Sequence, residues 1–259
     1  MLERLFVTPM ADPPEYSKRT DVERSYRADN AADLLRTRLV IGESDLWIMS
    51  DRAVEERARQ SLLQFRRHLK EYIHRHPLFA KTLVPYPPDP EAYPIVQWMI
   101  AATAQVKVGP MAAVAGAVSG MLGRSLPEIP ELIIENGGDI YLRSARERIV
   151  AVYAGNSPFS EQVGLKIAPH PGAGLGICTS AGTVGPSLSL GKADAAVIVA
   201  ADVALADAAA TAAANQIHRA ADLAGAIGYV QELPGLQGAL LIKDDQMAAW
   251  GEIQLVALP

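Results

Sequence analysis

An aspartate and a threonine lie four residues apart in a segment made almost entirely of small apolar residues. Asp207 and Thr211 occur in ALADAAATAAAN, residues 204–215. On a helix, residues four apart share one face, and buried polar groups need partners. One interpretation is a hard cation such as Mg²⁺, whose remaining oxygen ligands are waters. The other is an aspartate that complements its own helix dipole and a threonine that bonds back to a carbonyl.

A Gly-Gly pair interrupts an apolar run earlier in the chain. The sequence IIENGGDIYL, residues 133–142, places Asn136 and Asp139 on either side of Gly137 and Gly138. Glycine adopts positive φ without steric cost, so the pair indicates a tight hairpin. The same backbone could instead present an open edge to a flat ring or a phosphate. Asn136 and Asp139 would then supply hydrogen bonds.

A third segment combines hydroxyl and small side chains. It reads CTSAGTVGPSLSLGKAD over residues 178–194. Runs of Gly and Ser can form anion-binding concavities from backbone N–H groups, although a polar surface loop has the same composition. No G-x-S-x-G elbow supports a nucleophilic serine, and Cys178 is expected to be a small buried residue. The segment's hydroxyls belong to Thr179, Ser180, Thr183, Ser187 and Ser189.

Periodic patterns predict the elements that position these segments. Apolar residues recur every three or four positions over residues 51–76, which indicates an amphipathic helix. GAGLG, residues 172–176, lacks the spacing of a dinucleotide fingerprint and is predicted to be a turn. Helices on a largely antiparallel sheet make the fold class α+β. Further helices are predicted over residues 94–104, 108–122 and 204–217, a hairpin over 38–49, and strands over 131–136, 139–143, 148–154, 163–168, 175–179, 195–201, 238–243 and 249–257.

Composition limits the class of protein. The 259 residues are 49% hydrophobic and 20% charged, as in soluble globular proteins. A formal net charge of -5 argues against a nucleic-acid partner. A single cysteine excludes an intrachain disulfide. There is no signal-peptide pattern and no run of about 18 apolar residues. We therefore expect a cytoplasmic protein without a membrane partner, with an extended arm over residues 1–33 and one domain over residues 34–259.

Taken together, the three segments resemble the ApbE superfamily, whose typical members are FAD:protein FMN transferases. The order matches: a Gly-Gly hairpin, a Thr-Ser-Gly-like loop and an A-D-x-x-x-T helix. The similarity is closer to a cytosolic branch of that superfamily without an assigned activity, and it covers about residues 24–245. The motifs that carry it are RSYR, HPLF, GPMAAVAG, ENGGD and the 178–194 segment.

The resemblance implies a T-fold-like ApbE architecture and a flavin nucleotide site. In the transferases, the Asp and Thr of the last motif bind magnesium together with a backbone carbonyl. These ligands correspond here to Asp207, Thr211 and the carbonyl of Ala112 or Ala113. Magnesium would neutralise the pyrophosphate and polarise the bond being cleaved. The residues implied to contact FAD or FMN are Asn136, Gly137, Gly138, Asp139, Thr179, Ser180, Gly182, Ser187 and Ser189.

Two departures from the family pattern concern the reaction. The transferases carry a Lys-Gly pair where this chain has VGPM, residues 108–111. They also carry a histidine followed by Asp-Pro where it has PSLS, residues 186–189. Their lipoprotein signal is missing as well. These groups contact substrate in the transferases, so no catalytic residue is assigned here.

The leading expectation is magnesium-dependent binding of, or catalysis on, FAD or a similar pyrophosphate ligand. One version transfers FMN to a Thr or Ser of an acceptor protein, and the other carries the nucleotide without cleaving it. The alternative is a non-flavin enzyme or accessory factor of small-molecule or sulfur metabolism that kept the fold and changed the ligand. A homodimer is one option for the assembly.

Overall fold

The computed structural model describes residues 33–182 and 190–258, which form eleven strands, five α-helices and three short 3₁₀ helices. The strands are β1 (Leu35–Ile41), β2 (Ser44–Ser50), β3 (Leu132–Asn136), β4 (Asp139–Ser144), β5 (Arg148–Ala151), β6 (Val163–Ile167), β7 (His170–Ser180), β8 (Ala195–Ala200), β9 (Leu236–Lys243), β10 (Gln246–Gly251) and β11 (Gln254–Ala257). The helices are α1 (Glu55–Arg75), α2 (Pro94–Gln105), α3 (Val114–Arg124), α4 (Val203–Asn215) and α5 (Leu223–Gln231), with η2 (Pro77–Ala80), η3 (Pro110–Ala113) and η4 (Ala220–Asp222).

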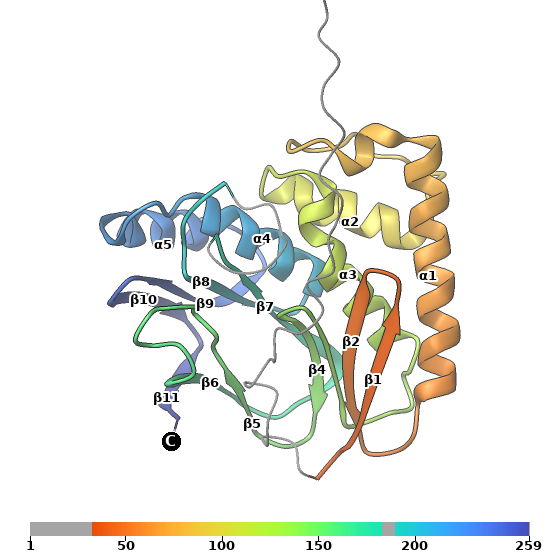
Figure 1. Ribbon diagram of the computed structural model, residues 1–259, viewed down its shortest axis with the longest axis horizontal. Coiled ribbons are helices and arrows are strands. Elements are labelled where there is room, and N and C mark those ends of the chain that lie inside the picture. Colours follow the sequence, from red (N-terminus) through yellow and green to blue (C-terminus); the bar gives the residue numbers. More distant parts are fainter. Residues whose placement is uncertain (1–32, 183–189, 259) are drawn as a thin grey trace, which may run out of the picture.

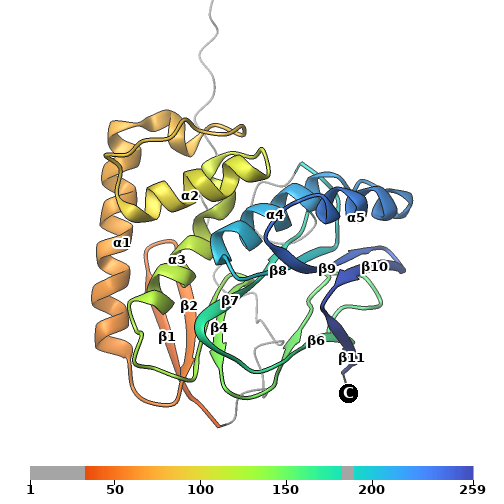
Figure 2. The ribbon, with the colours of Figure 1, turned by 180° about the vertical axis from the view of Figure 1, so that it is seen from behind.

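The strands form two sheets. The large sheet has the order β1-β2-β3-β4-β7-β8-β9-β10, and the small sheet has the order β11-β6-β5. Every described strand pair is antiparallel. The helices lie over one face of the large sheet, and the small sheet lies on the opposite side (Figures 1 and 2). The predicted α+β class, with a mostly antiparallel sheet packed with helices, is confirmed.

Two hydrophobic layers follow from the alternation of side chains along the strands. On β8, Ala196 and Ile198 belong to the cluster under the helices. Ala195 and Val197 belong to the cluster between the two sheets. Since both faces are covered, all six residues of β8 are buried. The uninterrupted apolar run of this strand is the sequence signature of that position.

Glycines let α3 approach its neighbours closely. A Cβ at Gly116 would lie 2.6 Å from the carbonyl oxygen of Val203 in α4. A Cβ at Gly123 would overlap the ring of Tyr141 in β4. Neither approach is possible for a larger residue without a shift of the helix, because packed interiors hold few voids. Glycine at these two positions therefore sets the distance from α3 to α4 and to the sheet.

A buried arginine fixes the chain at the C-terminal end of α3. The Arg143 guanidinium donates hydrogen bonds to the carbonyl oxygens of Gly123, Leu126 and Ile129, each at 2.8 Å. The last carbonyls of a helix lack an intrahelical partner, and buried ones need another donor. One side chain of β4 thus adds three short hydrogen bonds to the end of α3 and the turn that follows it, where the oxygens of Gly123 and Leu126 otherwise accept only backbone N–H bonds of 3.3 Å.

Two predictions around β7 are wrong. The strand begins at His170 rather than at residue 175, so GAGLG, residues 172–176, is part of a strand and not a turn. The glycines accommodate a neighbour: a Cβ at Gly174 would overlap the Tyr141 ring. The pairing of β4 with β7 also shifts register between Leu142 and Ser144, and glycines are common at such irregularities.

Three further boundaries differ from the predictions. The single strand predicted over residues 249–257 is two strands in different sheets, because the chain turns at Gly251, whose φ is +86°. The helix predicted over residues 108–122 begins as the 3₁₀ turn η3 and becomes α-helical at Val114. Helix α5 was not predicted, since LAGAIGYVQ has two glycines and a weak apolar stripe.

The predicted domain limits remain predictions. Of the extended arm expected over residues 1–33, only Asp33 is within the described part of the chain, where it pairs with Arg146 and Arg148. Among the described residues, no single helix is long and apolar enough to cross a membrane; α2 and the segment Pro110–Arg124 pass that test only as a pair bent by 104°.

The Arg143 contacts generate a stability prediction. We expect Arg143→Met to lower the free energy of unfolding by about 3 kcal/mol or more, because three carbonyl oxygens each lose a 2.8 Å hydrogen bond and two of them keep only a backbone bond of 3.3 Å. Chemical denaturation monitored by circular dichroism measures this change. Arg146→Met is the matched control: its exposed pair with Asp33 contributes about 0–1 kcal/mol. Equal losses in the two variants would contradict the role given to Arg143.

Candidate functional site

The Gly-Gly pair forms the tight hairpin predicted from the sequence. Asn136 at the end of β3 pairs with Asp139 at the start of β4, which leaves a two-residue loop. Gly137 and Gly138 have φ of +71° and +113°. Both values lie in the region that favours glycine, and two-residue loops of this kind match the twist of the strands. The hairpin places Asn136 and Asp139 side by side at one end of the sheet.

Asp139 points toward the helices and is almost fully buried. It shares a face of β4 with the core residue Tyr141, and 8% of its surface is exposed. Its carboxylate accepts hydrogen bonds from the backbone N–H of Thr179 and the thiol of Cys178. Its Oδ1 atom has no hydrogen-bond partner among the described residues. A buried carboxylate oxygen without a partner is costly, so this atom is a candidate ligand for a cation or a hydrogen-bond donor.

Asp207 lies on α4 and faces the start of α3. The backbone N–H of Gly116 donates to its Oδ2 at 2.8 Å, and the N–H of Ala115 also bonds to the carboxylate. These are among the first N–H groups of α3, which have no partner within the helix. The carboxylate therefore complements the dipole of α3 rather than that of its own helix, whose N-cap is Asp202.

The two carboxyl groups influence each other. Burial raises the pKa of Asp139 well above its usual range, and the negative charge of Asp207 raises it further. Burial raises the pKa of Asp207 from 3.8 to about 7, against the lowering effect of the Gly116 and Ala115 amides. Two neighbouring carboxylates disfavour each other's ionised form. A cation between them would remove this conflict.

Asn136 joins the hairpin to the same helix end. Its side-chain Nδ2 donates to the carbonyl oxygen of Ala115 at 3.2 Å. The hairpin, the start of α3 and the middle of α4 thus meet at one place, although they lie far apart in the sequence. We call Asn136, Asp139, Asp207 and the Ala115–Gly116 backbone the carboxylate site.

The other predicted site residues are not part of the carboxylate site as defined here by its side chains and backbone. Cys178 and Ser180 are on the helix-facing side of β7, whereas alternation turns Thr179 to the other face. Thr211 is half-buried one turn after Asp207 on α4, and η3, which contains Ala112 and Ala113, packs against α4. Gly182 is exposed, and its N–H donates to Ala193. Ser187 and Ser189 fall outside the described residues.

Cys178 is a buried neutral thiol. Burial raises its pKa well above the usual range, and the charges of Asp139 and Asp207 raise it further. Its Sγ lies 3.5 Å from the carbonyl oxygen of Val203. A thiol nucleophile needs a lowered pKa and access, so this residue is a packing residue, as predicted.

The oxygen atoms of the site would fit a magnesium ion that has few protein ligands. Among the described residues, no three His, Cys, Asp or Glu side chains are placed to hold a metal. Magnesium, however, is usually bound by one or two carboxylates, substrate phosphates and waters. Asp139 and Asp207 supply two carboxylates, with a Thr211 hydroxyl and a backbone carbonyl of η3 on the neighbouring turns. The Oδ1 atom of Asp139 is the observation that favours this fit.

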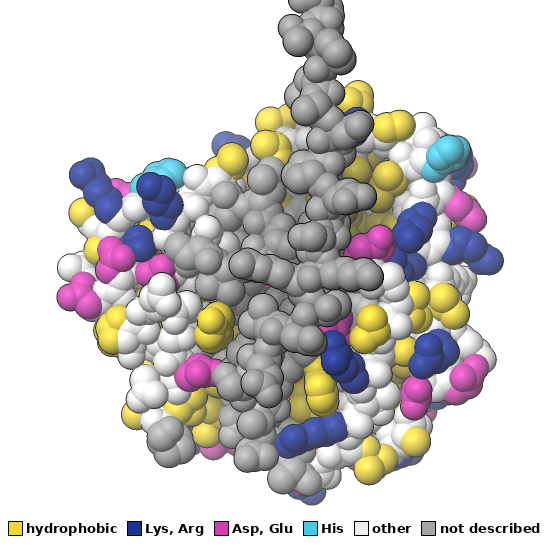
Figure 3. Space-filling view, viewed as in Figure 1, with side chains coloured by type: hydrophobic (Ala, Val, Ile, Leu, Met, Phe, Trp, Pro, Cys, Tyr) yellow, Lys and Arg dark blue, Asp and Glu magenta, His cyan; other side chains and the backbone are white. Residues whose placement is uncertain are grey.

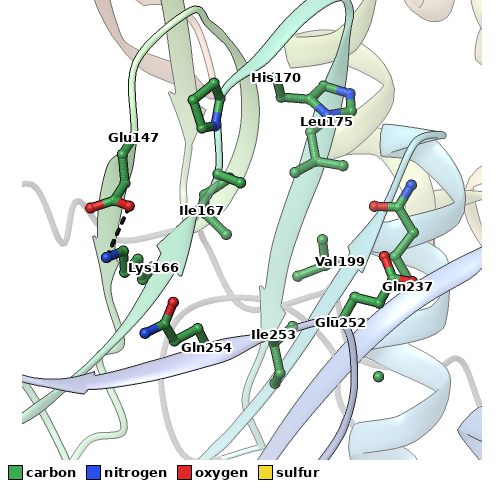
Figure 4. A pocket seen from close by; sticks show the side chains of 13 residues that line it. Glu147, Lys166, Ile167, His170, Leu175, Val199, Gln237, Glu252, Ile253 and Gln254 are labelled. Carbon is green, nitrogen blue, oxygen red and sulfur yellow. Dashed lines mark ion pairs between the residues drawn. The ribbon is translucent and has the colours of Figure 1, made fainter.

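A separate pocket lies on the far side of the large sheet. It has a volume of about 440 Å³ and opens between the two sheets (Figure 4). Its floor is apolar and its rim carries the ion pair of Glu147 with Lys166 at 2.9 Å. None of the predicted site residues lines it, and no sequence motif marks it. The side chains labelled in Figure 4 include Ile167, His170, Leu175, Val199, Gln237, Glu252, Ile253 and Gln254.

Sequence reasoning missed the amides of Ala115 and Gly116. The run GPMAAVAG carries the family resemblance, but its amide donors to Asp207 were not predicted. A Pro at position 110 followed by small residues signals a helix start, and every helix start has free N–H groups. That signal, combined with a buried aspartate elsewhere, could have suggested the pairing.

Relatives of known sequence identify the family. A family model described as AbpE bacteria matches residues 26–228. The UPF0280 protein of Methanocella arvoryzae is 40% identical over 215 residues, which cover 82% of this chain and 87% of the relative. The chain belongs to the ApbE-like family, in its UPF0280 branch. The UPF0280 protein of Methanothrix thermoacetophila is 42% identical over 202 residues, covering 76% of this chain and 84% of that relative.

Solved structures support the fold of this UPF0280 protein. The Pseudomonas stutzeri flavinyl transferase ApbE, in its apo form, superposes with a TM-score of 0.55 over 84% of this chain and 93% of that chain. A variant of the Vibrio cholerae flavin transferase ApbE gives 0.52 over 88% and 98%. Both are 10% identical in sequence, so the similarity shows the fold alone. The predicted ApbE architecture is confirmed.

The raised pKa of Asp207 generates a pH prediction. Between about pH 4 and pH 7 the folded protein holds a proton that the unfolded chain has lost. The contribution of Asp207 to stability therefore falls as the pH rises through this window and stays low above it. In EDTA, we expect Asp207→Asn to lose less stability than the wild type between pH 4.5 and 7.5. Denaturant titrations across this range measure it; parallel profiles would contradict the assignment.

Proposed function

We propose that this protein binds a flavin dinucleotide such as FAD, through its pyrophosphate group and with magnesium, at the carboxylate site. One observation carries the proposal: Asp139 is buried beside Asp207 at the end of a Gly-Gly hairpin, and its Oδ1 has no hydrogen-bond partner within residues 33–182 and 190–258. A cation that bridges the carboxylates to a phosphate would satisfy this atom. The flavin transferases of similar fold give the ligand class.

The surroundings of the site support an extended ligand. If residue 137 carried a Cβ, no atom of the described residues would lie within 4 Å of that Cβ. A Cβ at residue 138 would meet only Thr179, whose carbonyl oxygen would lie 3.6 Å away. The outer edge of the hairpin therefore leaves room for a flat ring or a phosphate against the bare backbone, as close approach to a ligand requires. Ser180 follows on the helix-facing side of β7 and could donate its hydroxyl hydrogen.

Bound magnesium would offset the phosphate charge and polarise the pyrophosphate bond. The chain's own residues would hold Asp207 in place through the amides of α3, and Asp139 through the amide of Thr179. Burial of both carboxyl groups excludes water from one side of the site. These features bind and orient a pyrophosphate whether or not it is cleaved.

Two versions of the function differ in chemistry. In FMN transfer, a hydroxyl oxygen of an acceptor protein forms a bond to the phosphorus of the FMN half. The pyrophosphate bond breaks, AMP leaves with the electron pair, and the hydroxyl proton passes to a base. In nucleotide carriage no bond changes. The sequence favours carriage, because residues 108–111 are VGPM where the transferases have a lysine.

On the face shown in Figure 3, Lys and Arg side chains are interspersed with Asp and Glu. This surface gives no electrostatic reason to prefer a nucleic acid over a small nucleotide as ligand. An acceptor protein and a cytoplasmic location remain parts of the proposal.

A thermal-shift titration tests the function. We expect FAD to raise the melting temperature only when Mg²⁺ is present, with FMN, ADP and ATP as the comparison ligands. Asp207→Asn should remove the Mg²⁺-dependent part, because the carboxamide still accepts from Gly116 but carries no charge. Asp202→Asn is the matched control: it lies on the same helix, caps it, and bonds to Trp98 away from the site.

Three outcomes separate the alternatives. A shift with FAD and release of AMP on incubation with cell protein would establish transfer. A shift without AMP release would establish carriage. No shift with FAD or FMN, with or without Mg²⁺, would overturn the flavin proposal. The alternative would then remain, in which the protein kept the ApbE-like fold but acts on a different ligand.

A further inference from the structure

The segment that precedes Asp33 joins the described part of the chain at a fixed point. The Asp33 carboxylate accepts a hydrogen bond from Arg148 at 2.8 Å. Arg148 also donates to Glu131 at 2.8 Å, at the residue before β3. Leu34 is buried in the hydrophobic cluster between the sheets, together with Ile133. The chain therefore enters at the first end of β3, on the side of the large sheet that faces away from the helices.

That side of β1, β2 and β3 carries a mixed polar and apolar row. Helices α1 and α3 pack on the other face, and Figures 1 and 2 show β5, β6 and β11 well to one side of β1 and β2. Paired residues share a face, so Arg38, Trp47 and Glu135 form a row across the three strands, and Ile140 of β4 continues it. Arg38 itself pairs with Asp45 at 2.9 Å.

Glu135 is a buried carboxylate in this row. Its exposed fraction is 4%, and its cross-strand neighbours Trp47 and Ile140 carry no charge. Buried carboxylates are paired with cations or held by hydrogen-bond donors. Burial and the charge of Asp207 raise the pKa of Asp139, and the charge of Glu135 raises it further. A cationic partner for Glu135 would therefore stabilise two carboxylates.

The segment before Asp33 carries a cation at a suitable distance. Four residues separate Glu131 from Glu135, which is about 13 Å along β3. Arg27 is the basic residue of that segment nearest to Asp33 and lies six positions before it. Six residues span up to about 20 Å when extended. The RSYR motif, residues 24–27, which the proposed function does not use, can thus reach Glu135.

We propose that residues 24–27 dock on the face of β1, β2 and β3 that is turned away from the helices, with the Arg27 guanidinium on the Glu135 carboxylate. Arginine suits this role because its planar group can donate two parallel hydrogen bonds to one carboxylate. The docked segment lies beside the Gly137–Gly138 hairpin. It lines the space for the nucleotide only if the proposed function holds, whereas the docking does not rest on that function.

Limited trypsin digestion of the full-length, nucleotide-free protein tests the docking. Trypsin cleaves after Arg24 and Arg27, and a docked segment is cut in proportion to its released fraction. We expect cleavage at Arg24 to be at least about tenfold slower than in a synthetic peptide of residues 18–33. Mass spectrometry identifies this cut by the fragment that begins at Ser25. Cuts within residues 33–258 would instead report unfolding of the whole protein.

Glu135→Gln and Arg27→Gln are the decisive variants. Each should speed cleavage at Arg24 by at least about fivefold, and the double variant should be no faster than either single one, because residues in contact are not additive. Glu252→Gln is the matched control on the protein surface, since this carboxylate is exposed at the pocket rim. Arg19→Gln is the control within the segment. Both controls should stay within about twofold of the wild type.

The outcomes are distinct from those of the proposed function. Slow cleavage of the wild type, with equal and non-additive gains in the two decisive variants, supports the docking. Cleavage of the wild type at the rate of the peptide would overturn the docking, and a Mg²⁺-dependent shift by FAD would then leave the proposed function standing. Slow cleavage that neither variant changes would overturn the pairing of Arg27 with Glu135. Slow cleavage with the expected variant effects, but no shift by FAD, would support the docking and overturn the proposed function.

Discussion

The hydrogen bond from the start of α3 to the Asp207 carboxylate is the interaction on which the arrangement of the site depends. It joins two helices and fixes a buried charge at the positive end of a helix dipole. It forms only because residue 116 is glycine, since any side chain there would meet α4. The opposite end of α3 is fixed by Arg143. A helix held at both ends by side chains of other elements gives the hairpin a rigid wall to face.

The fold was predictable where one physical signal dominated. The uninterrupted apolar run of β8, the periodic stripe of α1 and the Gly-Gly hairpin each have a single local cause, and all three were placed correctly. The predictions of secondary structure failed where a glycine could have either of two structural roles. In β7 glycine makes room for the Tyr141 ring, and at Gly251 it turns the chain into a second sheet. Local sequence cannot distinguish these uses, because the deciding neighbour is distant in the chain.

The side chains of the carboxylate site were among the predicted site residues, but its backbone donors and its internal contacts were not predicted. The residue types and their order brought Asp139 and Asp207 into one hypothesis. The sequence could not show that Asp207 is bonded to another helix, or that the Oδ1 atom of Asp139 lacks a hydrogen-bond partner within the described part of the chain. Both facts depend on which face of the sheet each side chain occupies and on the close approach of α3. Those are properties of packing rather than of spacing.

The separation of the paired residues along the chain has a consequence for how the protein forms. The large sheet adds its strands nearly in sequence order, so pairing can proceed as the chain emerges. The start of α3, however, finds its carboxylate 91 residues later. During synthesis the first half of the protein is therefore left with uncapped backbone amides until α4 arrives, and contacts of such long range slow folding. The carboxylate site is therefore complete only after α4 has been synthesised.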